Sequence, residues 1–540
     1  MGAAIGREFS YELIRAIADI DEDTLLDTLD RLSESELIFR RGKPPNATYQ
    51  FKHALVQDAA YGSLLKSRRQ QLHAEIAKVL AENYRELTER QPELLAHHCT
   101  QAGLAEPALE HWRAAAARAI ARSAYQEAIE QLDQALTQLE KLPADEARDK
   151  CELELHVMKF GPLFPVKGYA SREAEEASAR ALSLCRSVGD NDTYFPAMYA
   201  RWAVNYVKSE QKEILELSRE YLHRANAVNY DAARIVGNRI HSVALLLRGD
   251  VEDAYAHAHQ ALDLYVPKEH GPLVSRFGQD LKVQAINYLS VSGALLGKTD
   301  EVVTLAAEAI DHAHRVNHVN TLAYALWHVG VWLPAIIRDS ETVHRYGTEL
   351  LELTREQRLG FWEAFGSPHV IINGHGKTRA EAAAETEQAL GHLRNKYNCL
   401  LIVPEVLCRV GEAYLDAGLT RDAERALNEA AGLMKKTGEV YWEPELYRIR
   451  GRLAATKANK HSKEPEREFH KAIDVARKKG MKLLELRAST ALARLWAERG
   501  DEEKAIEMLS PLYDSFEQGF DKPDLQDAKI VLDALHAGRG

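Results

Sequence analysis

The sequence has no apolar run approaching the roughly 20 residues that a membrane-spanning helix needs. Its N-terminus also lacks a basic segment followed by an apolar one, so it predicts neither a membrane span nor a secretory signal. Cysteine is scarce, because only 5 occur in 540 residues and none form a Cys-x-x-Cys pair. Isolated cysteines in an odd number are typical of a reduced, cytoplasmic protein.

Motifs that carry chemistry are lacking as well. Gly-Lys-Thr at residues 376–378 follows an apolar run, but a phosphate-binding loop needs a glycine five residues before Gly376, where Ile371 stands. Residues 373–378 are therefore predicted to form a turn between two helices. There is no Gly-x-Ser-x-Gly elbow, and paired histidines such as His97 and His98 lack the spacing of a zinc protease helix. The sequence thus predicts no catalytic residue, no cofactor and no metal site.

The composition that is present favours helices. Aromatic residues make up only 7% of the chain, whereas alanine and leucine, which lose little entropy in a helix, are abundant. Hydrophobic residues at 46% and charged residues at 28% are ordinary globular values. A chain of 540 residues is too long for one compact core, which indicates several domains or one extended array.

Residues 1–90 have a pattern of their own. Residues 9–18 and 21–32 carry apolar side chains at helical spacing and are predicted to be two helices. Two short β-prone runs, residues 37–41 and 48–51, flank a turn rich in glycine and proline and predict a hairpin. Helix, helix and hairpin are the outline of a winged-helix module.

The rest of the chain, residues 91–535, is predicted to be a solenoid of about nine helix pairs of the tetratricopeptide kind. In residues 404–436, the small Gly411 and Ala423 would let two helices approach closely, and Gly418 would form the turn between them. The same alternation of bulky and small residues recurs elsewhere in the chain. The matching stretches are residues 112–135, 245–261, 297–309 and 492–512.

The predicted fold class is therefore all-α, a tetratricopeptide-like helical-repeat solenoid with a small N-terminal winged-helix-like segment containing one β-hairpin. Stacked repeats leave a concave surface, lined by the first helix of each pair, and we expect it to bind a protein or peptide. Helical spacing places five polar residues on that surface. They are Arg113, Arg239, Asn287, Glu412 and Arg494.

Nucleic acid is not the partner that the charges favour. The chain has 69 Lys and Arg against 81 Asp and Glu, a net charge of -12, which repels a phosphate backbone. Arg40, Arg41 and Lys43 would make the wing of a winged helix basic, but residues 22–31, its candidate recognition helix, are mostly acidic. A winged-helix transcription regulator stays open as an alternative.

Five stretches resemble the C-terminal half of bacterial class III adenylate/guanylate cyclase-related AAA-ATPase signalling proteins. They are residues 4–10, 37–42, 49–61, 91–98 and 486–496. In that family a cyclase domain precedes an AAA-type ATPase, a winged-helix segment and tetratricopeptide repeats. The cyclase domain with its metal-binding aspartates and the ATPase core with its phosphate loop have no counterpart in this sequence.

The resemblance therefore carries no catalytic residue to any position here. It implies a non-enzymatic regulatory or scaffold protein, a truncated or split version of the family that keeps the regulatory arm. It also implies a possible association with a cyclase or ATPase chain. A second alternative is thus a subunit or fragment of such an enzyme, whose catalytic domains lie on another chain.

Overall fold

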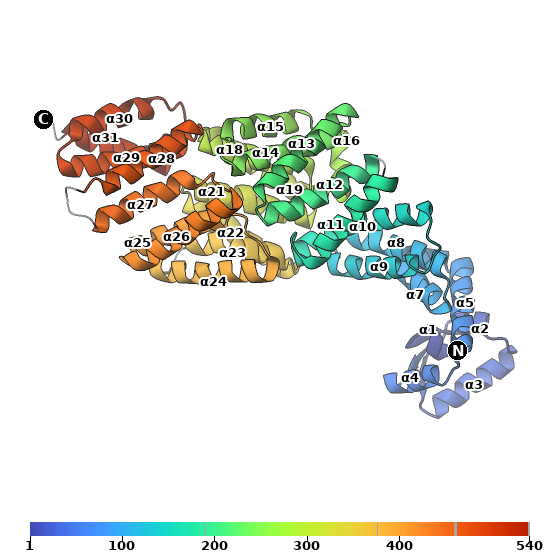
Figure 1. Ribbon diagram of the computed structural model, residues 1–540. Helices are drawn as coiled ribbons and strands as arrows, with labels where there is room; N and C mark the ends of the chain where they lie inside the picture. The colour runs from blue at the N-terminus through green and yellow to red at the C-terminus, as the bar shows by residue number, and fades with distance from the viewer. Residues whose placement is uncertain (190, 375, 458–461, 538–540) are drawn as a thin grey trace. The chain divides into compact units, whose positions relative to one another are not determined.

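A computed structural model describes residues 1–189, 191–374, 376–457 and 462–537 of the chain (Figure 1). The chain divides into two compact units, residues 1–155 and 156–540. The described residues are mostly helical, and their strands form one small sheet, which confirms the predicted all-α class. The predicted division at residue 90 lies inside the first unit and stays a prediction. None of the helices described is long and apolar enough to cross a membrane.

The first unit opens with a three-stranded antiparallel sheet in the order β1-β3-β2. The strands are β1 (Glu8–Ser10), β2 (Ile38–Arg41) and β3 (Thr48–Phe51). The predicted hairpin is confirmed as β2 and β3, but the prediction of one helix over residues 9–18 is wrong at its start. Phe9 pairs with Tyr49 in the sheet and stacks on its ring, with centroids 5.7 Å apart. The helix α2 (Tyr11–Ile17) begins only after Ser10, whose hydroxyl accepts a hydrogen bond from the backbone N–H of Leu13.

The remaining helices of the first unit cover this sheet or pair with one another. The carboxylate of Asp21 caps α3 (Glu22–Glu34) by accepting from Thr24 N at 2.9 Å, and Leu25 and Leu29 of α3 are buried. The others are α1 (Gly2–Ile5), α4 (Ala54–Gly62), α5 (Lys66–Asn83), α6 (Arg85–Arg90), α7 (Pro92–Ala102), α8 (Ala105–Ala121) and α9 (Tyr125–Leu139). A further helix, α10 (Glu146–Lys167), contains the division at residue 155.

The second unit is an array of antiparallel helix pairs. The pairs are α12 (Asn191–Val207) with α13 (Gln211–Ala227), α14 (Asp231–Leu247) with α15 (Val251–Asp263), α18 (Leu281–Leu295) with α19 (Thr299–Val316), α23 (Gly360–Ile372) with α24 (Arg379–Tyr397), α25 (Val403–Asp416) with α26 (Thr420–Thr437), α27 (Glu443–Lys457) with α28 (Glu464–Lys478), and α29 (Lys482–Arg499) with α30 (Glu502–Asp514). Short connections between consecutive helices impose this antiparallel order.

Other segments complete the array. The helix α22 (Ser340–Glu356) packs on a continuous helical run made of α20 (Val319–Ala325), the π-helical η2 (Leu326–Trp332) and α21 (Leu333–Ile336). The helix α31 (Pro523–Ala537) packs on α29 and α30. The remaining segments are α11 (Arg172–Val188), α16 (Pro267–His270), η1 (Gly271–Leu273) and α17 (Val274–Phe277).

The predicted packing within a repeat is confirmed in α25 and α26. A Cβ atom on Gly411 would lie 2.9 Å from Leu427, so only glycine lets the two helices come this close. Ala423 on the facing helix is fully buried. Gly418 forms the turn with φ +76°, a conformation that favours glycine.

Distant repeats of the array also lie side by side. The carbonyl of Val207 at the end of α12 accepts from Leu400 N at 3.0 Å, and that of Leu247 at the end of α14 accepts from Val440 N at 2.8 Å. The sequence interval is the same in both cases, so two successive early repeats contact two successive late ones. In Figure 1 the green helices and the orange ones accordingly lie next to each other. This arrangement buries α14 and α18 on nearly all sides.

Candidate binding site

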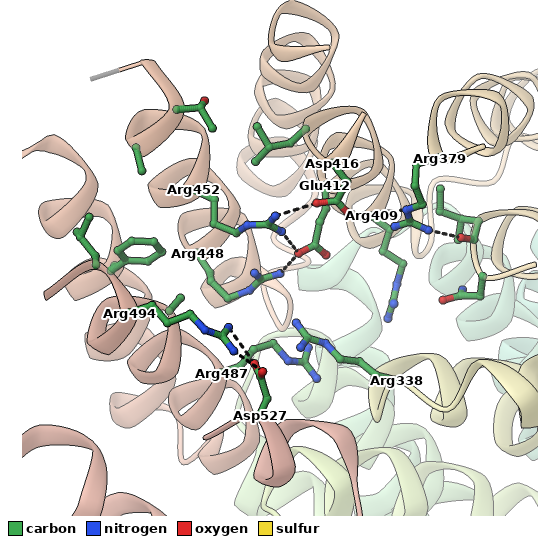
Figure 2. A pocket seen from close by; sticks show the side chains of 18 of the residues that line it. Arg338, Arg379, Arg409, Glu412, Asp416, Arg448, Arg452, Arg487, Arg494 and Asp527 are labelled. Carbon is green, nitrogen blue, oxygen red and sulfur yellow. Dashed lines mark hydrogen bonds and ion pairs between the residues drawn. The ribbon is translucent and has the colours of Figure 1, made fainter. Parts of the chain in front are cut away.

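A cavity of about 730 Å³ in the second unit is lined by arginine side chains from several repeats (Figure 2). They come from α24, α25, α27 and α29, and from the turn between α21 and α22. The arginines are Arg338, Arg379, Arg409, Arg448, Arg452, Arg487 and Arg494. Helical spacing explains the grouping, because Arg448 and Arg452 are four residues apart and Arg487 and Arg494 are seven apart, so each pair shares one helix face.

The deepest arginines are held by buried carboxylates. Arg448 donates through Nε to Glu445 Oε1 at 2.8 Å and through Nη2 to Glu412 Oε1 at 2.6 Å. Arg487 donates to both oxygens of Asp524 and lies 3.3 Å from Glu445. Guanidinium donors in this geometry form the strong, charge-assisted kind of hydrogen bond. The floor of the cavity is therefore a fixed network of alternating charge.

The same network sets the ionisation of Glu412. Burial alone would raise the pKa of this carboxyl, but Arg448, Arg338 and Arg452 outweigh burial and hold the pKa well below its usual range. Burial would likewise raise the pKa of Asp524, but Arg487 outweighs burial, so the pKa of this carboxyl is also lowered. Both carboxylates stay charged at neutral pH, and so do the arginines that surround them.

The arginines nearer the opening are more exposed than Arg448 and Arg487. Arg452 donates to Glu412 at 2.7 Å and to Asp416 at 2.8 Å, and Arg494 forms a half-exposed pair with Asp527. Within the described part of the chain, Arg338 has one carboxylate at ion-pair distance, Asp524 at 3.1 Å, and shares it with Arg487. A guanidinium has five N–H donors, and a third to a half of each of these three side chains is exposed, so an incoming acceptor can reach them.

Apolar side chains complete the wall between the arginines. They include Ile372, Leu415, Phe469 and Leu495, which lie on four different helices. A cavity with arginine donors and apolar surface suits a ligand that carries carboxylate or carbonyl groups beside apolar groups.

The structure places the five predicted groove residues in three different environments. Glu412 and Arg494 line the cavity (Figure 2). Arg113 lies in the first unit, half exposed and 2.8 Å from Glu154. The expectation that Arg239 and Asn287 line an open surface is wrong, because the two residues are only 2% and 0% exposed. Their helices, α14 and α18, are covered by distant repeats. Whether any of the five contacts a partner stays a prediction.

Most of the cavity arginines were missed by the sequence reasoning, although a signal for them exists. Arg409, Arg448 and Arg487 recur at equal spacing in the sequence, at corresponding places on the first helices of three successive pairs. An arginine repeated in register with the helix pairs indicates that these side chains stack along one surface of the array.

The Gly-Lys-Thr segment lies in a turn, as predicted, between α23 and α24. Thr378 caps α24, since its hydroxyl accepts from Glu381 N at 3.3 Å and the Glu381 side chain accepts in return from Thr378 N at 2.9 Å. The ammonium of Lys377 pairs with Glu385. His375 of the same segment lies outside the described residues.

Comparisons with known proteins give limited similarity. No family model matches the chain. An uncharacterized protein of Rhizobium meliloti is 25% identical over 504 residues, which cover 91% of this chain and 48% of that protein. The chain thus spans about half the length of this curated relative.

Two solved structures are similar at 12% identity. A Rap protein complexed with competence and sporulation factor matches with a TM-score of 0.36 over 79% of this chain and 98% of its own. Yeast Tom70 matches with a TM-score of 0.30 over 88% of this chain and 97% of its own. The fold assignment given above rests on the helix pairs themselves.

Proposed function

We propose that the chain is a non-catalytic regulatory or scaffold protein that binds acidic polypeptide segments in the arginine-lined cavity. The observation that carries this proposal is that Arg338, Arg452 and Arg494 line the cavity with a third to a half of each side chain exposed, while carboxylates hold the deeper arginines in place. An arriving carboxylate meets guanidinium groups whose positions are already fixed, so little ordering entropy is lost on binding.

The lining favours a polypeptide over a nucleic acid. Apolar lining residues that are not fully buried, Ala455 and Ala491, offer contacts to apolar side chains of a peptide. A net charge of -12 repels a phosphate backbone at long range, whereas a short acidic segment needs only the local field of the cavity.

A peptide-binding experiment tests the proposal. We would measure fluorescence anisotropy with labelled peptides of one length, built from Leu, Phe and Gly with Glu, Gln or Lys at fixed positions. The Glu peptide is expected to bind best and to weaken as salt rises. The double variant Arg452→Glu with Arg494→Glu is expected to lose at least tenfold in affinity for the Glu peptide.

The control for that experiment is Arg477→Glu. Arg477 is an exposed arginine paired with Glu485 at 2.8 Å, outside the cavity, so its reversal breaks a comparable ion pair without changing the lining. Equal binding of the Glu and Gln peptides, or equal losses in the control and the double variant, would contradict the proposal.

We further propose that the chain serves as the regulatory arm of an adenylate/guanylate cyclase-type signalling system. The support is the resemblance of the five sequence stretches. The test adds purified chain to a class III cyclase from the same organism and follows cyclic nucleotide formation. A rate that changes with wild-type chain and not with the double variant supports the proposal, and an unchanged rate contradicts it.

The transcription-regulator alternative has weaker support. Arg40 of the hairpin pairs with Asp30, and Lys52 pairs with Glu36, so acidic partners neutralise part of the basic surface. The helix α3 opens with Glu22 and Asp23, which would face phosphate groups unfavourably if this helix entered a groove of DNA.

A further inference from the structure

A small chamber in the second unit, separate from the arginine-lined cavity, is lined by Arg239. Its volume is about 20 Å³, and its walls come from α12, α14, the helical run of α20 and η2, and α23, together with Tyr169 and Leu401 of two connecting segments. Most of the wall is aromatic, with Tyr199, Trp202, Tyr324 and Trp362 among the lining residues. Arg239 itself lies on α14 and is 2% exposed.

The charge of Arg239 has no ionic partner in the described part of the chain. Arg448 and Arg487, which are equally buried, each contact two carboxylates. For Arg239, by contrast, no Asp or Glu oxygen of the described residues lies within ion-pair distance. Its guanidinium carbon lies 5.1 Å from the ring centroid of Tyr199 and 5.2 Å from that of Trp202. Ring faces stabilise a cation, but they accept no strong hydrogen bond.

Three N–H donors at this chamber lack an acceptor. Nε and Nη2 of Arg239 and Nε1 of Trp202 are buried and have no hydrogen-bond partner among the described residues. The polar groups of His328 are already engaged, since Nε2 lies 3.0 Å from the hydroxyl of Tyr288 and Nδ1 lies 2.8 Å from the carbonyl of Tyr324. The chamber therefore combines one uncompensated positive charge with three unused donors.

A buried guanidinium without a negative partner destabilises the folded state, and so does each buried N–H group without an acceptor. A chamber that combines both is therefore expected to hold a ligand. A water molecule could accept two of the hydrogen bonds, but it would leave the charge uncompensated. A volume of about 20 Å³ exceeds the ~10–15 Å³ that one water molecule needs and is too small for a phosphate or an amino acid.

We propose that this chamber binds a single small monovalent anion of the size of chloride, held by the N–H groups of Arg239 and Trp202. The anion accepts the unused hydrogen bonds and compensates the charge. Since the lining residues belong to several segments of the array, the bound anion ties α12 and α14 to η2 and α23. The proposal concerns the interior of the array and does not depend on the function proposed for the arginine-lined cavity.

Thermal unfolding in different sodium salts tests this site. At constant ionic strength, replacing gluconate with chloride or bromide is expected to raise the Tm by a few degrees along a saturating curve, because an anion that binds only the folded state stabilises it. Gluconate is too large for the chamber and serves as the reference anion. Equal Tm values in chloride and gluconate would overturn the proposal.

Two variants and one control assign the effect to the chamber. Trp202→Phe keeps an aromatic ring and removes one donor, so the half-saturating chloride concentration should rise several-fold. Arg239→Met should abolish the chloride dependence, whereas Arg494→Met, which removes an arginine from the open cavity, should keep it. Should Arg239→Met fail to fold, the Trp202→Phe result decides, and an unchanged half-saturating concentration in that variant overturns the proposal.

Crystals grown in sodium bromide supply an independent readout. An anomalous bromide peak is expected in the chamber, within hydrogen-bond distance of Arg239 and Trp202. A water molecule with no anomalous signal at that position would overturn the proposal.

Discussion

Arg487 and Asp524 form a two-point ion pair beneath the arginine-lined cavity. Nε of the arginine donates to Oδ1 at 2.9 Å and Nη2 donates to Oδ2 at 2.5 Å, with only 4% and 2% of the two side chains exposed. Arg338 approaches the same carboxylate to 3.1 Å, and Nη2 of Arg487 also donates to the carbonyl of Ile336 at 2.8 Å. One carboxylate from α31 thus joins α29 to the end of α21.

We expect Asp524→Asn to destabilise the second unit strongly. The change removes the Asp524 carboxylate from Arg338 and leaves the buried Arg487 with Glu445 alone, and loss of one partner of a buried pair costs about 3–5 kcal/mol. The matched control is Asp527→Asn, which breaks the half-exposed pair with Arg494 and should cost about 0–1 kcal/mol. Urea unfolding of both variants measures the difference, and similar losses in the two would contradict the expectation.

Replacing glycine by alanine is expected to have opposite effects on stability at two positions of one helix pair. Gly411→Ala places a Cβ 2.9 Å from Leu427, so it should destabilise the fold by roughly 1–3 kcal/mol through overpacking. Gly432 on α26 is exposed with nothing within 4 Å of an added Cβ, so Gly432→Ala should stabilise the helix by about 0.5–1 kcal/mol. Thermal unfolding distinguishes the two, and a gain of stability in Gly411→Ala would show that the close helix contact is not needed.

The sequence predicted what depends on neighbours along the chain. The small residues Gly411 and Ala423 and the turn at Gly418 follow from the periodicity within one repeat, and the structure has them as expected. Phe9 is an exception, because its place in a helical pattern could not reveal that a strand 40 residues later would pair with it.

What depends on distant repeats could not be predicted from helical spacing. Glu412 and Arg494 were placed on the concave side and line the cavity. Arg239 and Asn287 were placed on the same side by helical spacing, yet they are buried, because the hydrogen bonds from Leu400 to Val207 and from Val440 to Leu247 bring late repeats over α12, α14 and their neighbours. Such a closure involves residues nearly two hundred positions apart and leaves no local pattern.

Acid is expected to destabilise the first unit through two histidines. Nδ1 of His73 lies 2.8 Å from Nδ1 of His98, and Nε2 of His73 lies 2.9 Å from the hydroxyl of Tyr61. Burial, with a smaller contribution from the neighbouring histidines, lowers the pKa of His98 to about 3 and that of His73 to about 4. Protons therefore bind the unfolded chain first, and stability present above about pH 6.5 is lost as the pH falls.

The measurement is the urea midpoint of the first unit at pH 7 and at pH 5, with unfolding monitored by the fluorescence of Trp112. His98→Gln should show a smaller fall between the two values than wild type, because it removes one of the two buried bases. An equal fall in both proteins would mean that other groups cause the acid sensitivity.

The purified chain is expected neither to hydrolyse ATP nor to form cyclic nucleotide. In the one segment that resembles a phosphate loop, Lys377 pairs with Glu385 and Thr378 caps α24, so both side chains serve the connection between two helices. Phosphate release and cyclic nucleotide formation can be measured with wild type and Lys377→Ala. Turnover that survives stringent purification and disappears in the variant would contradict this expectation.

Glu439 is a buried carboxyl at the place where early and late repeats meet. Its side chain accepts from the hydroxyl of Ser209 at 2.6 Å and from Ile402 N at 3.0 Å, and the residue is 1% exposed. Burial raises the pKa of Glu439 to about 8, although these two hydrogen bonds act in the opposite direction. The folded chain therefore holds a proton that the unfolded chain has already released at neutral pH.

Stability from this group is fully present below the unfolded pKa of about 4.3 and is lost as the pH rises toward 8. Glu439→Gln stays neutral at every pH and can still accept from Ile402 N, so it should remove this part of the pH dependence. We expect the urea midpoint of the second unit to fall less between pH 6 and pH 9 in the variant than in wild type, and the variant to be the more stable protein at pH 9. The same fall in both proteins would show that Glu439 is ionised in the folded chain throughout this range, and the contact between early and late repeats would then not respond to pH through this carboxyl.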